Sequence, residues 1–234
     1  MLKSVLGEIA KMLESGLFGF LYRVTDVIYK LAWSNILWFF TAGFPLVFLF
    51  TGDWLLLTLM LLLISPPGTA ALFHVMWVWQ EDGDISIWKE YWSGLRKNWK
   101  QAYIVINPYI FIGIVLVVDL IVVANVEQSP LKWIGFLVLP LFTLYMLTSV
   151  TLLSLLVRYQ WKLSDLVKKA FFMSVSHLFS SVTILIFLVT VILSAFWVMP
   201  LLVFFFFASL TVWVFTWQTG RILNKIKHLG IHSK

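Results

Sequence analysis

Long apolar stretches constrain this 234-residue chain more than any other feature of its sequence. They recur at a length of about 20 residues, which is what an α-helix needs to cross the hydrocarbon core of a bilayer. Charged residues make up 12% of the chain, whereas a soluble domain carries about 25%. The sequence therefore predicts an all-α integral membrane protein.

The order of apolar and amphipathic segments predicts a single membrane domain with six transmembrane helices in three hairpins. An amphipathic helix at the membrane surface precedes each hairpin. The predicted segments are an interfacial helix at 2–26, hairpin 1 at 29–79, an interfacial helix at 85–101, hairpin 2 at 103–157, an interfacial helix at 163–176, hairpin 3 at 178–217 and a basic tail at 218–234. The three modules share hydropathy rather than residue identity.

Two consecutive prolines, Pro66 and Pro67, interrupt the second predicted span. They remove two backbone donors, so we expect the helix to kink or restart there. Inside a membrane the freed carbonyls need donors from neighbouring helices or from water. The interruption should therefore face protein rather than lipid.

The distribution of Lys and Arg predicts the orientation in the membrane. Sixteen of the 17 cationic residues fall in segments expected on one side, and only Lys132 falls on the other. By the positive-inside rule, both termini and all three interfacial helices lie in the cytoplasm.

The helix expected over 85–101 carries the most distinctive surface. Its aromatic and aliphatic residues share one helical face, and its cations fill the opposite face. Such a helix lies in the membrane interface, with its rings among headgroups and its charged groups in water. The candidate partner-binding residues here are Trp88, Trp92, Trp99, Arg96 and Lys97, together with Asp82 and Asp84 of the preceding acidic turn. That turn either docks a basic partner surface or is a solvated loop ahead of a helix N-terminus, and we favour the second.

Several polar or helix-breaking residues at membrane depth form a second candidate set. They are Pro66, Pro67, His74, Asn107, Asp119 and His177. Together they could line a transport cavity, because ionisable groups and helix breaks at this depth often mark one. We favour packing or headgroup contacts for the two histidines and a structural role near the outer interface for Asp119. The other half of the chain has no helix break to match Pro66 and Pro67, which counts against a transport cavity.

The sequence offers little for catalysis or metal binding. It contains no cysteine, which excludes disulfides and thiolate chemistry. His228 and His232 lie four residues apart but lack the further ligands that a zinc site needs. No catalytic motif is present, so we expect no enzyme activity, no cofactor and no metal.

Four short motifs give a resemblance to a known family. They are SNILW at 34–38, PGTAAL at 67–72, DISIWKEYWSGL at 84–95 and NWKQA at 98–102. They resemble the YesL-like family of small bacterial membrane proteins, mostly from Gram-positive bacteria, a domain of unknown function. Here Trp88 and Trp92 stand where that family usually has phenylalanine. Its members commonly occur alongside carbohydrate importers of the ATP-binding-cassette (ABC) type and sugar-responsive sensors.

The resemblance implies an accessory role in oligosaccharide uptake or its sensing, by association only. A permease is not expected, because Trp88, Lys89 and Glu90 replace the E-A-A of the importer coupling motif. Our leading hypothesis is a non-catalytic plasma-membrane subunit that binds an importer permease, its ATPase or a sensor kinase, as well as membrane lipids. The alternatives are a small transporter or channel that acts alone and, less favoured, a lipid-binding protein.

Overall fold

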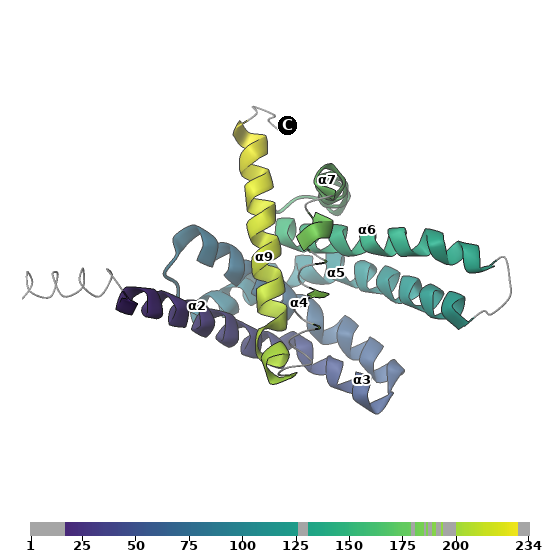
Figure 1. Cartoon of the computed structure of the whole chain (residues 1–234), viewed down its shortest axis with the longest axis horizontal. Helices are drawn as coiled ribbons and strands as arrows, with labels where there is room; N and C mark the ends of the chain where they lie inside the picture. The colour runs from purple at the N-terminus through teal and green to yellow at the C-terminus, as the bar shows by residue number, and fades with distance from the viewer. Residues whose placement is uncertain are drawn as a thin grey trace, which may run out of the picture.

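The computed structural model describes residues 17–125, 131–178, 181–184, 186, 189–190, 193 and 200–228. Every regular element in these ranges is helical (Figure 1). In chain order they are α2 (Leu17–Trp38), η1 (Phe39–Gly43), η2 (Phe44–Val47), α3 (Phe48–Thr51), α4 (Trp54–Asp82), α5 (Ile87–Asn125), α6 (Leu131–Arg158), α7 (Leu163–Ser176) and α9 (Pro200–His228). Residues 2–16, most of the predicted fifth span and the end of the basic tail lie outside the described residues.

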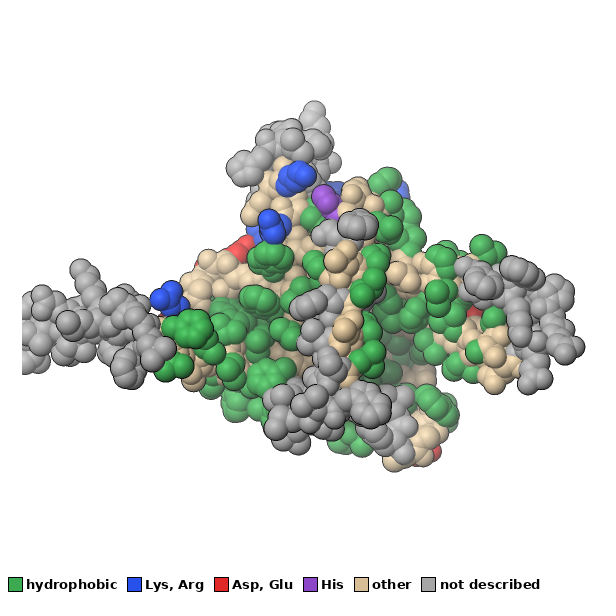
Figure 2. All heavy atoms as spheres, viewed as in Figure 1, with side chains coloured by type: hydrophobic (Ala, Val, Ile, Leu, Met, Phe, Trp, Pro, Cys, Tyr) green, Lys and Arg blue, Asp and Glu red, His purple; other side chains and the backbone are tan. Residues whose placement is uncertain are grey.

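Three helices within the described residues are long and apolar enough to cross a membrane. They are α4, α5 and the Leu137–Arg158 part of α6. Large apolar side chains also cover much of the surface in Figure 2, where Lys and Arg appear mainly at the left and top. These features agree with a helical membrane protein, and the other spans remain predictions.

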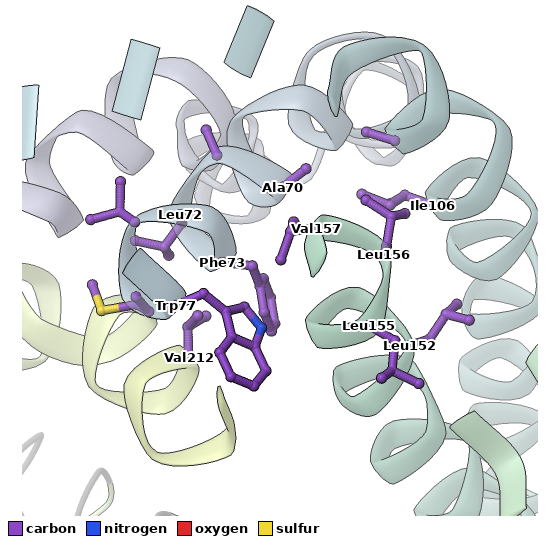
Figure 3. Close-up of a cluster of buried hydrophobic side chains, with 14 of the residues drawn as sticks. Ala70, Leu72, Phe73, Trp77, Ile106, Leu152, Leu155, Leu156, Val157 and Val212 are labelled. Carbon is purple, nitrogen blue, oxygen red and sulfur yellow. The ribbon is translucent and has the colours of Figure 1, made fainter. Parts of the chain in front are cut away.

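Helix α4 lies at the centre of the fold and contacts α2, α5, α6 and α9. Ala70, Ala71 and Leu72 have no exposed surface. Small side chains at such positions let neighbouring helices approach closely in a membrane. Figure 3 shows Phe73 and Trp77 of α4 between side chains of α6 and α9. The core is therefore built around the C-terminal half of α4.

Helix α5 differs from the sequence prediction. We expected an interfacial helix at 85–101 and a separate span from 103, whereas the structure has one continuous helix of 39 residues. The reason is local, because no glycine or proline lies between Asn98 and Asn107 to end the helix. The surface segment and the predicted span therefore form one continuous helix, which contains Pro108 and runs beside α6 (Figure 1).

Helix α7 spans Leu163–Ser176, the residues predicted for the third amphipathic helix. It packs on α6 through a buried face that includes Leu166, Ala170 and Met173. Its other face leaves Phe172 67% exposed. A helix of this kind buries one apolar stripe and leaves the rest for another environment.

Candidate functional site

The first turns of α5 carry an open groove, which we call the tryptophan groove. It is lined by Trp88, Lys89, Trp92, Ser93, Arg96 and Lys97 and has a volume of about 820 Å³. The opposite side of this part of α5 faces the core, because Tyr91 and Ala102 have no exposed surface. The groove therefore opens away from the core, with Trp92 half-buried at its inner side.

The tryptophan groove combines aromatic and cationic side chains. The rings of Trp88 and Trp92 meet edge to face, with their centroids 5.6 Å apart. The sequence pattern placed tryptophans and cations on opposite faces, but Lys89 and Arg96 line the same groove as the tryptophans. The buried side of the helix is instead formed by the residues in register with Tyr91, which lie on a different face from both groups.

Trp99 does not line the tryptophan groove. It is 46% exposed, and the Lys100 ammonium lies 5.4 Å from its ring centroid. An indole and a cation at this distance attract each other weakly at an exposed site. Of the three predicted tryptophans, two therefore share one surface and the third lies apart from it.

The acidic turn contacts cations of its own chain. The Glu81 carboxylate lies 2.7 Å from Arg158, and the Asp84 carboxylate lies 3.8 Å from Lys30. Lys30 is buried and also donates a hydrogen bond of 3.1 Å to the carbonyl of Gly83. Asp82 is exposed. The turn therefore joins α2, α4 and α6, which leaves less of its charge for an external partner.

Arg158 and Trp77 make a contact that the sequence analysis did not predict. The guanidinium lies 4.5 Å from the centroid of the Trp77 ring. The Trp77 indole also donates a hydrogen bond of 2.8 Å to the carbonyl of Ser154. Together with the Arg158–Glu81 pair, these contacts fix the C-terminal end of α6 against α4.

Pro66 and Pro67 lie inside α4, which is helical without interruption and does not restart there. The missing donor of Pro67 frees the carbonyl of Leu63, four residues earlier. Tyr103 of α5 donates a hydrogen bond of 2.6 Å to that carbonyl. Pro66 is buried, so it faces protein as predicted, whereas Pro67 is half-buried.

The first predicted span is distorted where it meets these prolines. It changes from α2 into the π-helix η1 and then the 3-10 helix η2, which contains Pro45. Ser65 of α4 donates a hydrogen bond of 2.6 Å to the carbonyl of Ala42. A Cβ atom at Gly68 would lie only 2.7 Å from the Ala42 Cβ. The absence of a side chain at Gly68 therefore permits this close crossing.

Tyr91 joins the same junction from α5. Its hydroxyl lies 3.0 Å from the Gly68 carbonyl, to which it donates a hydrogen bond. The hydroxyl also contacts Thr41 of η1. Three helical segments thus share one buried polar network, and such networks specify a particular packing when every member is satisfied.

The residues predicted to line a transport cavity lie against different elements. His74 of α4 lies 3.7 Å from the Glu90 carboxylate and packs on Gly94. The Oδ1 atom of Asn107 is buried with no hydrogen-bond partner among the described residues, and Asp119 is exposed. His177 lines another groove, together with Arg221 of α9. The structure therefore does not gather these residues around one space.

Acidic and imidazole side chains do not form a metal site in the described part of the chain, where no three of them come together. His228 is the last residue of α9. His232 lies beyond the described residues. The predicted site residues thus line surface grooves or make packing contacts between helices.

The three long apolar helices agree with the class of helical membrane proteins, and the first turns of α5 add an aromatic and cationic groove. Residues 31–120 match the model of a family described as "Protein of unknown function, DUF624". The match contains η1, η2, α4 and the tryptophan groove. Comparisons with curated proteins and with solved structures found no match.

Proposed function

We propose that this chain is a non-catalytic accessory subunit of the plasma membrane, which binds a partner membrane protein through the tryptophan groove. The groove is the observation that carries the proposal. Exposed tryptophan and arginine side chains are the residue types that contribute most at protein interfaces. Trp88 is 54% exposed although it belongs to a helix whose other side is well packed.

The partner that we propose is a carbohydrate importer of the ABC type or its sensor kinase. This choice rests on the resemblance to the YesL-like family. The proposed orientation places both termini and the groove in the cytoplasm, where an importer ATPase and a kinase domain lie.

Replacement of Trp88 and Trp92 by alanine tests the proposal. The tagged full-length chain is purified from its bacterial host in mild detergent, and the proteins that accompany it are measured by quantitative mass spectrometry. We expect the unchanged chain to bring permease and ATPase subunits, or a sensor kinase, in stoichiometric amounts. The Trp88→Ala/Trp92→Ala variant should recover on the order of tenfold less.

Trp54→Ala is the matched control, because Trp54 is 66% exposed and lies at the opposite end of α4 from the acidic turn. It should recover the partner as the unchanged chain does. Equal recovery with Trp88→Ala/Trp92→Ala would refute the groove as the binding site. Purification of the unchanged chain alone would refute the accessory function.

A small transporter is the second candidate, favoured by the buried Oδ1 atom of Asn107, which has no hydrogen-bond partner in the described part of the chain. Such a group at membrane depth is costly unless it binds something. Flux of sugars, ions or protons into liposomes that contain the purified chain, reduced by Asn107→Leu, would support this function. Absence of flux for all three classes would exclude it.

A further inference from the structure

A second groove lies between α5 and residues 159–162, which connect α6 to α7. We call it the connector groove. Its lining includes Lys97, Lys100, Gln101, Ile104, Gln160 and Trp161, and its volume is about 390 Å³. Lys97 also lines the tryptophan groove, whereas Lys100 and Gln101 do not.

The polar end of the connector groove is positively charged. Lys97 and Lys100 are both exposed, and neither Asp nor Glu is among the residues that line the groove. Gln101 and Gln160 add amide donors beside the two ammonium groups. This end therefore attracts an anion with several acceptor oxygens.

The wall of the groove is held in place by contacts within the chain. Gln101 donates a hydrogen bond of 3.5 Å to the carbonyl of Tyr159. The rings of Tyr159 and Trp161 stack with their centroids 4.1 Å apart. Lys169 of α7 lies 3.7 Å from the centroid of the Trp161 ring. The groove is thus formed before any ligand arrives, which lowers the entropic cost of binding.

The apolar end continues onto the membrane-spanning part of α5. Ile104 is 61% exposed, Phe111 is 63% exposed and Val115 is 45% exposed. Their spacing of seven and four residues places them on one helical face. A ligand that fits both ends has an anionic head and hydrocarbon chains, which a soluble phosphate compound lacks.

We propose that the connector groove binds one anionic phospholipid. Its phosphate lies between Lys97 and Lys100, and its acyl chains lie along Ile104, Phe111 and Val115. This proposal is independent of the partner-binding function. It assigns a ligand to a surface at which the chain meets lipid whether or not another protein is present.

Competition between two lipids tests the proposal. The full-length chain in mild detergent is incubated with equal amounts of phosphatidylglycerol and phosphatidylcholine that carry the same acyl chains. Native mass spectrometry then counts the lipids that remain bound. We expect one phosphatidylglycerol per chain, and its affinity should fall on the order of tenfold in Lys97→Gln/Lys100→Gln, since each basic residue near a lipid surface contributes appreciably.

Lys89→Gln/Lys168→Gln is the charge-matched control, because both lysines are exposed and neither lines the connector groove. The affinity of this control variant for phosphatidylglycerol should change by less than about twofold. Lys100→Gln alone should show an intermediate loss, which separates the connector groove from the tryptophan groove. Size-exclusion profiles of the variants check that each is folded.

Three results would overturn the proposal. The first is unchanged retention in Lys97→Gln/Lys100→Gln. The second is equal retention of both lipids. The third is full displacement of the bound phosphatidylglycerol by excess glycerol 3-phosphate, which would identify a site for soluble anions instead.

Discussion

One side chain of α5 supplies a hydrogen bond that a proline of α4 leaves open. Tyr103 supplies a donor to the Leu63 carbonyl, whose partner within the helix is lost at Pro67. An unpaired carbonyl in a membrane interior costs free energy, because water does not reach it. The tyrosine hydroxyl therefore compensates for the backbone donor that is missing at Pro67.

Tyr103→Phe should lower the free energy of unfolding by about 1 kcal/mol, the usual scale of one hydrogen bond between membrane helices. The change removes only the hydroxyl and keeps the ring. Unfolding by denaturing detergent, followed by tryptophan fluorescence, measures it. Tyr29→Phe is the control, since Tyr29 is 57% exposed, and an equal effect of both variants would contradict the assigned role of Tyr103.

The sequence predicts that a donor is needed at this place but not which residue supplies it. Tyr103 lies 40 positions from Leu63. The sequence around it does not differ in pattern from the sequence at the start of the other predicted spans. The same holds for Tyr91, which reaches Gly68 from 23 residues away. Such pairs depend on how two helices cross, and helix periodicity carries no information about that crossing.

At the scale of elements, α4 and α5 form one unit whose parts compensate one another. Pro67→Ala restores a backbone N–H that can reach the Leu63 carbonyl within α4. In this background Tyr103→Phe should cost less than about 0.5 kcal/mol. Unfolding free energies of the two single variants and the double variant form the cycle that measures this coupling.

Additive effects in that cycle would show that Tyr103 stabilises α4 through another contact. Pro66→Ala is the comparison, because it restores a donor to a different carbonyl, that of residue 62. The cost of Tyr103→Phe should remain near its original value there. The two proline variants thus distinguish the carbonyl that Tyr103 serves.

The continuity of α5 also decides what the tryptophan groove is attached to. The sequence predicts a surface helix followed by a separate span, since amphipathic and apolar patterns meet near residue 102. The structure joins them without a break. The spacing of apolar residues shows which face of a segment is apolar. A helix ends where a capping residue, a glycine or the missing donor of a proline interrupts its hydrogen bonding.

At the scale of the whole molecule, charged contacts join the middle of α2 to the C-terminal ends of α4 and α6. Lys30 of α2 meets the turn after α4 at Gly83 and Asp84, and Arg158 at the end of α6 meets Glu81. Exposed ion pairs contribute little to stability, but Lys30 is 4% exposed and also lies 2.7 Å from Asp26. A buried charge of this kind favours one arrangement of the helices because others would leave it unpaired.

Orientation is a property of the whole chain, and the absence of cysteine makes it directly measurable. Ser129→Cys should react with a membrane-impermeant maleimide in intact cells, since the positive-inside rule places that loop outside. Ser86→Cys should react only after permeabilisation. The reverse pattern would contradict the proposed topology, and labelling of neither site in intact cells would exclude an external 126–130 loop.

The sequence by itself determined the class of this protein, because the length of an apolar run and the spacing of charged residues follow from the thickness of a bilayer and the pitch of a helix. It also predicted that Pro66 faces protein, as its burial shows. Only the tertiary structure decided that Tyr103 serves Leu63, that Arg158 covers Trp77, and that tryptophans and lysines share a groove. These contacts join residues distant in sequence, and their formation depends on helix crossings that local patterns do not encode.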